Sequence, residues 1–485
     1  MPDATAAGGT HHGAELRGAA VHPSSPFFEG RYGRMFRALP AFRPSEESLK
    51  DLAGHMFEAH GDDVDPGEGG GADPRHNPDI PAGYTYLGQF IDHDITFDPA
   101  SSLQRQNDPD ALRDFRTPRF DLDSLYGRGP ADDPFLYDQH PADSTVSGAV
   151  FLIGEGVGNG HDLPRNSQDR ALLGDPRNDE NLIVSQLHCT FLRFHNKMAA
   201  RVAEGSGRRG QDLFRETQRR VRWHYQWVVV HDFLKRVAGD QLVNQLMPPG
   251  STGDQIRSNL QFFHWQKAPF IPVEFSVAAY RFGHSMVRFD YTINDVVPET
   301  PIFSDDADPL ANLNGFRKLP QQWGFQWKFF FEMQPGHQPQ LSHKIDTKLA
   351  TPLKTLPKVV ADHPRSLAQR NLVRGMRFDL PSGQRVAQAM GEPPLTGAEL
   401  GIDDVSPEFV GHAPLWFYVL KEAELKRDGK RLGPVGARIV AEVLLGLLAG
   451  DPLSYVNVQP GFEPKPPLAS QGKFGMPELL RFAVS

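Results

Sequence analysis

The 485-residue sequence predicts a mainly α-helical protein whose helices are joined by long loops. Three observations support this prediction. Apolar residues recur at helical spacing in several segments, the longest over residues 180–204. Runs of alternating β-branched residues never exceed a few positions, so little β-structure is expected. Glycine and proline (46 and 42 residues) make up about 18% of the chain against roughly 12% in average usage, which indicates long connections.

The elements are predicted in chain order from the same signals. Residues 1–40 lack sustained periodicity and are expected to form an extended N-terminal arm. A loop rich in Gly, Pro and Asp is expected over 61–83, a short apolar-periodic run over 86–95, and irregular, turn-rich chain over 98–178. Helices are predicted over 180–204, 212–237, 273–287, 381–390, 414–426 and 437–449. The last is apolar almost all round yet too short to cross a bilayer, so it is expected to be a buried core helix.

Composition and charge exclude several classes of protein. The formal net charge of −9 argues against nucleic acid as the main partner. No run of 18 uninterrupted apolar residues exists, so no integral membrane segment is expected. The single cysteine, Cys189, excludes an intrachain disulfide framework and is expected to be a buried structural thiol. Residues 1–20 lack a recognisable secretory signal, so a cytoplasmic location is expected by default, with export by another route left open.

The segment GQFIDHD (88–94) concentrates polar side chains in an apolar run. If it is helical, Gln89 and His93 lie four residues apart on one face, with Asp92 and Asp94 flanking that face. A lone histidine is more often structural than functional. The two carboxylates favour a function here, because charged groups are costly in apolar surroundings.

Two further segments pair a cation with a second polar group. In GDPRNDEN (174–181), Arg177 and Glu180 are three apart, and N-terminal capping with surface charges is the favoured local interpretation. In AYRFGHS (279–285), Arg281 and His284 are three apart beside Gly283, whose missing side chain allows a flat group to approach closely.

The segment RFDLDSLYG (119–127) carries carboxylates at alternate positions. This pattern suits either a calcium site or a solvated turn.

Together and in this order, these segments resemble the animal haem peroxidase family (the peroxidase–cyclooxygenase superfamily), in its bacterial branch. The motifs GQFIDHD, TPRFDLDSLYG, GDPRNDEN, RFGH and an Asn–LPS segment run from residue 88 to 382, over half the chain. The resemblance implies a single large helical catalytic domain, placed at 41–485, behind the arm at 1–40. It also implies a haem peroxidase that reduces hydrogen peroxide and oxidises a small donor (halide, pseudohalide or phenolic) through a ferryl intermediate, with a role in the response to oxidative stress. The oligomeric state stays open.

The resemblance assigns three catalytic residues. His93 matches the family's distal histidine, Gln89 its neighbour above the haem, and Arg177 the distal arginine. Cleavage of peroxide needs a base that takes a proton from one oxygen and returns it to the other, which histidine can do. It also needs a fixed cation beside the oxygen–oxygen bond, which arginine supplies.

The resemblance also implies how haem b is held. His284 matches the proximal histidine that ligates iron, and Asn371 is the expected acceptor of the proton on the second nitrogen of that histidine. Arg281 is expected to pair with a haem propionate. Asp92 and Glu180 match the carboxylates that form ester links with haem, so such links are expected to be possible.

A calcium site is implied next to the distal histidine. Asp94 would supply one carboxylate, and Thr117, the backbone carbonyl of Arg119, Asp121 and Asp123 would supply the loop ligands. The family often has serine at the last position, and the extra negative charge here should still suit calcium.

Two alternatives remain open at this stage. A fatty-acid dioxygenase of the same superfamily would use a tyrosyl radical, and in the cyclooxygenase branch that tyrosine stands three residues before the proximal histidine. Arg281 occupies this position, which favours a peroxidase, although Tyr280 is its neighbour. An inactive adhesion scaffold is the other alternative. Asn181 stands where halide oxidisers of the family can carry a haem-linked methionine, so no such link is expected and strong chloride oxidation is in doubt.

Overall fold

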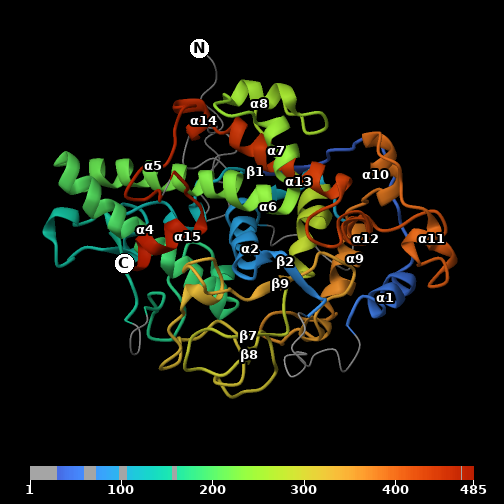
Figure 1. The fold of residues 1–485 in the computed structure, drawn as a ribbon, viewed down its shortest axis with the longest axis horizontal. Coiled ribbons are helices and arrows are strands. Elements are labelled where there is room, and N and C mark those ends of the chain that lie inside the picture. The colour runs from blue at the N-terminus through green and yellow to red at the C-terminus, as the bar shows by residue number, and fades with distance from the viewer. Residues whose placement is uncertain (1–29, 59–72, 98–105, 156–160, 471) are drawn as a thin grey trace, which may run out of the picture.

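The computed structural model describes residues 30–58, 73–97, 106–155, 161–470 and 472–485, which form helices packed around one apolar core (Figure 1). The helix α2 (Gly83–Ile95) lies near the centre of the view and contacts α4 (Leu182–Ser206), which in turn packs along α5 (Gly210–Val228). Within the described ranges, no helix is long and apolar enough to span a membrane. The prediction of a mainly α fold with little β-structure is confirmed.

Four of the predicted helices are found close to their expected bounds. These are α4, α10 (Gly383–Met390), α12 (Leu415–Arg427) and α13 (Pro434–Gly450). The helix α4 begins at Asn181, whose side chain accepts a hydrogen bond from the amide of Val184, and ends at Gly207 with a φ of +67°. As expected, α13 is a core helix, and its buried Glu442 accepts hydrogen bonds from three backbone amides, at residues 261–263.

Two predicted helices differ from the structure. The helix expected over 212–237 is α5 followed by a π-helical turn (Val229–Leu234) and α6 (Lys235–Ala238). The segment 273–287 is a π-helical turn (Glu274–Ala278) followed by a 3-10 helix, η8 (Ala279–His284), rather than an α-helix. Contacts with distant parts of the chain hold this irregular backbone. Trp416 donates to the carbonyl of Arg281 at 3.1 Å, and Glu274, within the segment, accepts from the amides of Met35 and Phe36.

Several short helices were not predicted because they span only one to three turns. They are α1 (Glu46–Gly54), α3 (Asp123–Tyr126), α7 (Asp240–Leu246), α8 (Gly253–Asn259), α9 (Leu367–Arg377), α11 (Gly397–Leu400), α14 (Tyr455–Val458) and α15 (Met476–Val484). The 3-10 turns are η2 (Pro109–Ala111), η3 (Pro134–Leu136), η4 (Ser144–Val146), η5 (Pro176–Asp179), η9 (Trp327–Phe329), η10 (Thr351–Lys354) and η11 (Pro407–Phe409). Of these, α9 and η5 matter most, since both carry predicted site residues.

The strands are short and form small sheets. One sheet has the order β3 (Arg113–Asp114), β1 (Gly30–Gly33), β6 (Ile271–Pro272), with β1 antiparallel to β3 and parallel to β6. The pairs are β2 (His76–Pro81) with β9 (Leu341–His343), β4 (Tyr137–Asp138) with β5 (Val150–Phe151), and β7 (Asp290–Tyr291) with β8 (Thr300–Pro301).

The structure bears on four further sequence expectations. The loop expected over 61–83 contains β2, and its residues 61–72 lie outside the described residues. Of the expected arm, residues 1–29 also lie outside them, while residues 30–33 form β1. Residues 106–155 and 161–178 are irregular, as expected. Cys189 is buried, and burial raises the pKa of its thiol to about 12, which is consistent with a structural role.

Candidate active site

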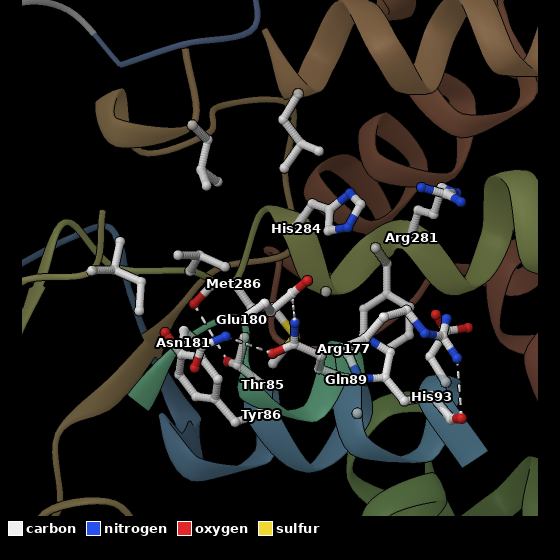
Figure 2. A pocket seen from close by; sticks show the side chains of 18 of the residues that line it. Thr85, Tyr86, Gln89, His93, Arg177, Glu180, Asn181, Arg281, His284 and Met286 are labelled. Atoms are coloured by element: carbon white, nitrogen blue, oxygen red, sulfur yellow. Dashed lines mark hydrogen bonds between the residues drawn. The ribbon is translucent and has the colours of Figure 1, made fainter. Parts of the chain in front are cut away.

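A cavity of about 400 Å³ lies between α2 and η8 (Figure 2). His284 extends from one side of this cavity, and Gln89 and His93 extend from α2 on the other. The structure therefore brings together residues that are nearly 200 positions apart in the sequence. The predicted site residues that line the cavity are Gln89, Asp92, His93, Arg177, Glu180, Arg281 and His284.

His93 lies near the end of α2 and is only 5% exposed. Its Nδ1 is 2.8 Å from Oδ1 of Asn178, which orients the ring with its other nitrogen toward the cavity. Burial, assisted by the positive charge of Arg177, lowers the pKa of His93 to about 3. The imidazole is therefore neutral near pH 7 and has a lone pair available.

Arg177 is fixed beside this histidine by a short 3-10 turn, η5. Its Nε donates to Oδ1 of Asp175 at 3.1 Å, and its Nη2 donates to the backbone carbonyls of His93 (3.1 Å) and Thr96. The guanidinium also lies over the ring of Phe97, 4.8 Å from its centroid. Burial disfavours the charge, but Asp175 outweighs it and raises the pKa of Arg177. The cavity thus has a permanent cation whose position is set by the end of α2.

The two carboxyl groups predicted to bind haem line the same cavity. Glu180 accepts a hydrogen bond from Nε2 of Gln89, and Oε1 of Gln89 accepts one from Asn181 at 3.1 Å. Burial raises the pKa of Glu180 to about 7. Asp92 accepts from the hydroxyl of Thr96 at 3.2 Å, and burial raises its pKa as well. Both groups are held near the cavity with reduced acidity.

His284, Asn371 and Arg281 form the opposite side, with one difference from the prediction. Nδ1 of His284 is 2.8 Å from Asn371, but the nearer atom is Nδ2, which donates. The expected acceptor, Oδ1, instead accepts from Nη1 of Arg281 at 3.0 Å. An arginine can only donate, so it takes the amide oxygen and turns the amide nitrogen toward His284. The predicted contact is present with the opposite polarity.

The walls of the cavity fit a flat, largely apolar cofactor. A Cβ built on Gly283 would meet no atom within 4 Å, so this backbone faces open space, as expected for close approach of a flat group. Apolar side chains also line the cavity: Ile302, Phe303, Leu353, Leu356, Val360, Ala361 and Leu367. Burial and the nearby Arg374 lower the pKa of Arg281 to about 10, so this cation would gain from a carboxylate partner. These features fit haem and its propionates.

The predicted calcium ligands also lie together. One carboxylate oxygen from each of Asp94, Asp121 and Asp123 lies within 4.8 Å of the others, and all three residues are buried. Burial and the two neighbouring carboxylates raise the pKa of Asp94 well above its ordinary value. Among the described residues, Oδ2 of Asp94 and Oγ1 of Thr117 are buried without a hydrogen-bond partner. Clustered oxygen donors with unmet polar atoms fit a hard cation such as calcium. Arg119 is buried in the same turn, its amide donating to the carbonyl of Thr117.

Three residues at or next to the site were not predicted from the sequence. The favoured local interpretation of residues 177–180 as capping and surface charges is wrong, because Asn178 is fully buried and the cap of α4 is Asn181. The side chain of Asn178 joins His93 to His188 on the buried face of α4. His188 was also overlooked. Its position on the apolar face of a long helix could have indicated a buried histidine with a hydrogen-bond partner. Arg370 was missed as well, and it lines the cavity.

The fold and this site define a class: mainly helical proteins with a cavity between two histidines. Residues 158–375 match the family model for animal haem peroxidase. This match agrees with the family that the sequence resemblance predicted.

Individual comparisons agree with this family. The chain is 27% identical over 171 residues to a chorion peroxidase from Aedes aegypti, covering 34% of this chain. The match spans 20% of the length of that relative. Peroxidase A from Dictyostelium discoideum has a similar fold, with a TM-score of 0.64, 15% identity and 97% of each chain covered. A fatty acid alpha-dioxygenase from Oryza sativa follows with a TM-score of 0.57, 14% identity, and 87% of this chain and 78% of that one covered.

Proposed function

We propose that this chain binds haem b between His284 and His93 and is a haem-dependent peroxidase, which reduces hydrogen peroxide and oxidises a small donor. The proposal rests mainly on one observation. A single cavity is lined by a neutral histidine on each side, His93 and His284, and Arg177 lies beside His93 as a fixed cation. A chain with this activity would remove peroxide under oxidative stress.

The residues around His93 supply the proton chemistry. Haem would supply the iron that binds peroxide and stores oxidising equivalents. Because His93 is neutral, its free nitrogen can take the proton of the bound peroxide and return it to the departing oxygen. Arg177 stabilises the negative charge that develops as the oxygen–oxygen bond breaks. A fixed donor of this kind is worth on the order of 3–4 kcal/mol.

Residues of η8, α2 and α9 would hold the cofactor. Burial and Arg281 lower the pKa of His284 to about 3, so it is neutral, as an iron ligand must be. If His284 held the iron, its Nδ1 would carry the remaining proton. The amide oxygen of Asn371 could accept a hydrogen bond from it once the amide turns and Arg281 pairs with a propionate. Asp92 and Glu180 are the candidates for ester links with haem.

Calcium is proposed as a second, structural ion, held by Asp94, Thr117, Asp121, Asp123 and the carbonyl of Arg119. Since Asp94 follows His93 directly on α2, an ion at this place would fix the end of the helix that carries the base. The unmet buried oxygens of Asp94 and Thr117 support this proposal.

A fatty-acid dioxygenase is the second candidate. Tyr280 lines the cavity and its hydroxyl donates to the carbonyl of Gly88 at 3.3 Å, which places a tyrosine between η8 and α2. The fold likeness to the rice dioxygenase supports the same alternative. Arg281, at the position of the radical tyrosine in the cyclooxygenase branch, favours the peroxidase.

One experiment separates these functions. The haem-loaded protein is mixed in parallel with peroxide and iodide, bromide or a phenol, and with oxygen and palmitate or linoleate. We expect peroxide-dependent oxidation of at least one small donor and no oxygen uptake with fatty acid. Oxygen uptake with fatty acid but no donor oxidation would establish the dioxygenase instead, and failure to bind haem would support an inactive scaffold.

A further inference from the structure

The hydrogen bonding of His93 extends away from the cavity through two more buried side chains. Oδ1 of Asn178 is 2.8 Å from Nδ1 of His93, and Nδ2 of Asn178 is 3.0 Å from Nδ1 of His188. All three residues are at most 6% exposed. They form one hydrogen-bonded chain from the cavity wall on α2, through η5, to the buried face of α4.

The middle residue fixes the direction of both hydrogen bonds. A carboxamide oxygen can only accept and a carboxamide nitrogen can only donate. Nδ1 of His93 therefore carries a proton, while Nδ1 of His188 carries none. A neutral imidazole ring has a single N–H, so the hydrogen bond at Nδ1 decides which form the second nitrogen takes. For His93 this leaves Nε2 with its lone pair facing the cavity.

We propose that Asn178, anchored by His188, is a positioning residue that holds His93 in the one tautomer able to accept a proton from hydrogen peroxide. The inference rests on the proposed peroxidase function. With the amide turned by half a rotation, Asn178 would donate to Nδ1 of His93, and the N–H would move to Nε2. The cavity would then face a hydrogen-bond donor where the reaction needs a base.

The tautomers can be read directly by long-range ¹H–¹⁵N NMR on the full-length chain with labelled histidine. Spectra are recorded without haem and in the diamagnetic ferrous carbonyl form, with assignments from His93→Gln and His188→Gln. We expect the proton on Nδ1 of His93 and on Nε2 of His188. The reversed pattern, with Nε2 of His93 protonated, would overturn the proposal.

A ligand-binding experiment tests the consequence without turnover. Hydrogen cyanide must give its proton to a base when it binds ferric haem, whereas carbon monoxide binds ferrous haem with no proton transfer. Asn178→Leu, which keeps the branched shape of the side chain but removes its polar atoms, should slow cyanide binding about 10- to 100-fold and leave carbon monoxide binding unchanged. The matched variant Asn178→Asp keeps an acceptor for His93 and should bind cyanide at no less than about half the original rate.

A double-mutant cycle separates positioning from a general structural effect. If Asn178 acts through His93, then Asn178→Leu should have no further effect on cyanide binding in a His93→Leu background. Equal slowing in both backgrounds, or slow binding in Asn178→Asp, would overturn the proposal. Failure of the peroxidase function is a separate outcome, because the NMR measurement on the haem-free chain reports the tautomers even if no peroxide is reduced.

Discussion

Glu180 should make the stability of the haem-free protein depend on pH in a way that one substitution removes. Burial raises its pKa from an ordinary 4.5 to about 7. At 1.36 kcal/mol per pKa unit, this difference corresponds to about 3 kcal/mol. The folded chain holds this proton more tightly than the unfolded chain. Below about pH 4.5 the carboxyl is protonated in both states and does not lower the free energy of unfolding. Its destabilising effect grows as the pH rises and is complete above about pH 7.

The assay is urea unfolding of the haem-free wild type and Glu180→Gln at several pH values. Glutamine keeps the size of the side chain and can still accept the hydrogen bond from Gln89. We expect the variant to gain about 3 kcal/mol relative to the wild type between about pH 4.5 and pH 8. Every other titrating group is common to both proteins and cancels in the difference. A stability difference that is the same at both ends of this range would refute the reasoning.

Three further predictions concern the cofactor and the ion. Gly283→Leu should fold normally but fail to take up haem, since its side chain enters open space in the cavity. The control Gly205→Leu, at an exposed site with equal room, should bind haem normally. Haem uptake by both variants would contradict this prediction. Removal of calcium by EGTA should lower Tm, by an amount equivalent to about 2.7 kcal/mol if calcium was present at 100 times its Kd. Asp121→Asn should abolish this effect and the exposed control Asp132→Asn should keep it; equal EGTA sensitivity in both would count against the site. His284→Ala should lose the histidine signature in the iron spectrum, and an unchanged spectrum would exclude it as the ligand.

The long helices could be predicted from the sequence because their apolar patterns are local. In α4 apolar residues recur at helical spacing, and α13 is a nearly continuous apolar run, so these patterns locate both helices within a few residues. The segment η8 could not be predicted in this way. It has a helical pattern, but contacts with distant residues hold the backbone of 274–284 in π and 3-10 turns: Trp416 bonds to Arg281, and Met35 bonds to Glu274.

The candidate site was predictable where residue type and motif spacing determine the role. His93, Arg177 and His284 were identified from their motifs, and the structure places all three around one cavity. The partners of these residues depend on tertiary packing instead. Asn178 resembles a helix cap in the sequence, and only the approach of α2 to α4 shows that it joins two histidines. The polarity of the amide beside His284 was likewise set by a distant group, the guanidinium of Arg281.

The central claim is that His93 acts as the base toward peroxide bound at a haem held by His284. Stopped-flow mixing of hydrogen peroxide with the haem-loaded wild type and with His93→Leu, at equal haem occupancy, tests it most directly. The account predicts that the variant keeps its haem and reacts about 10²- to 10⁴-fold more slowly. Equal rates of reaction with peroxide would contradict it.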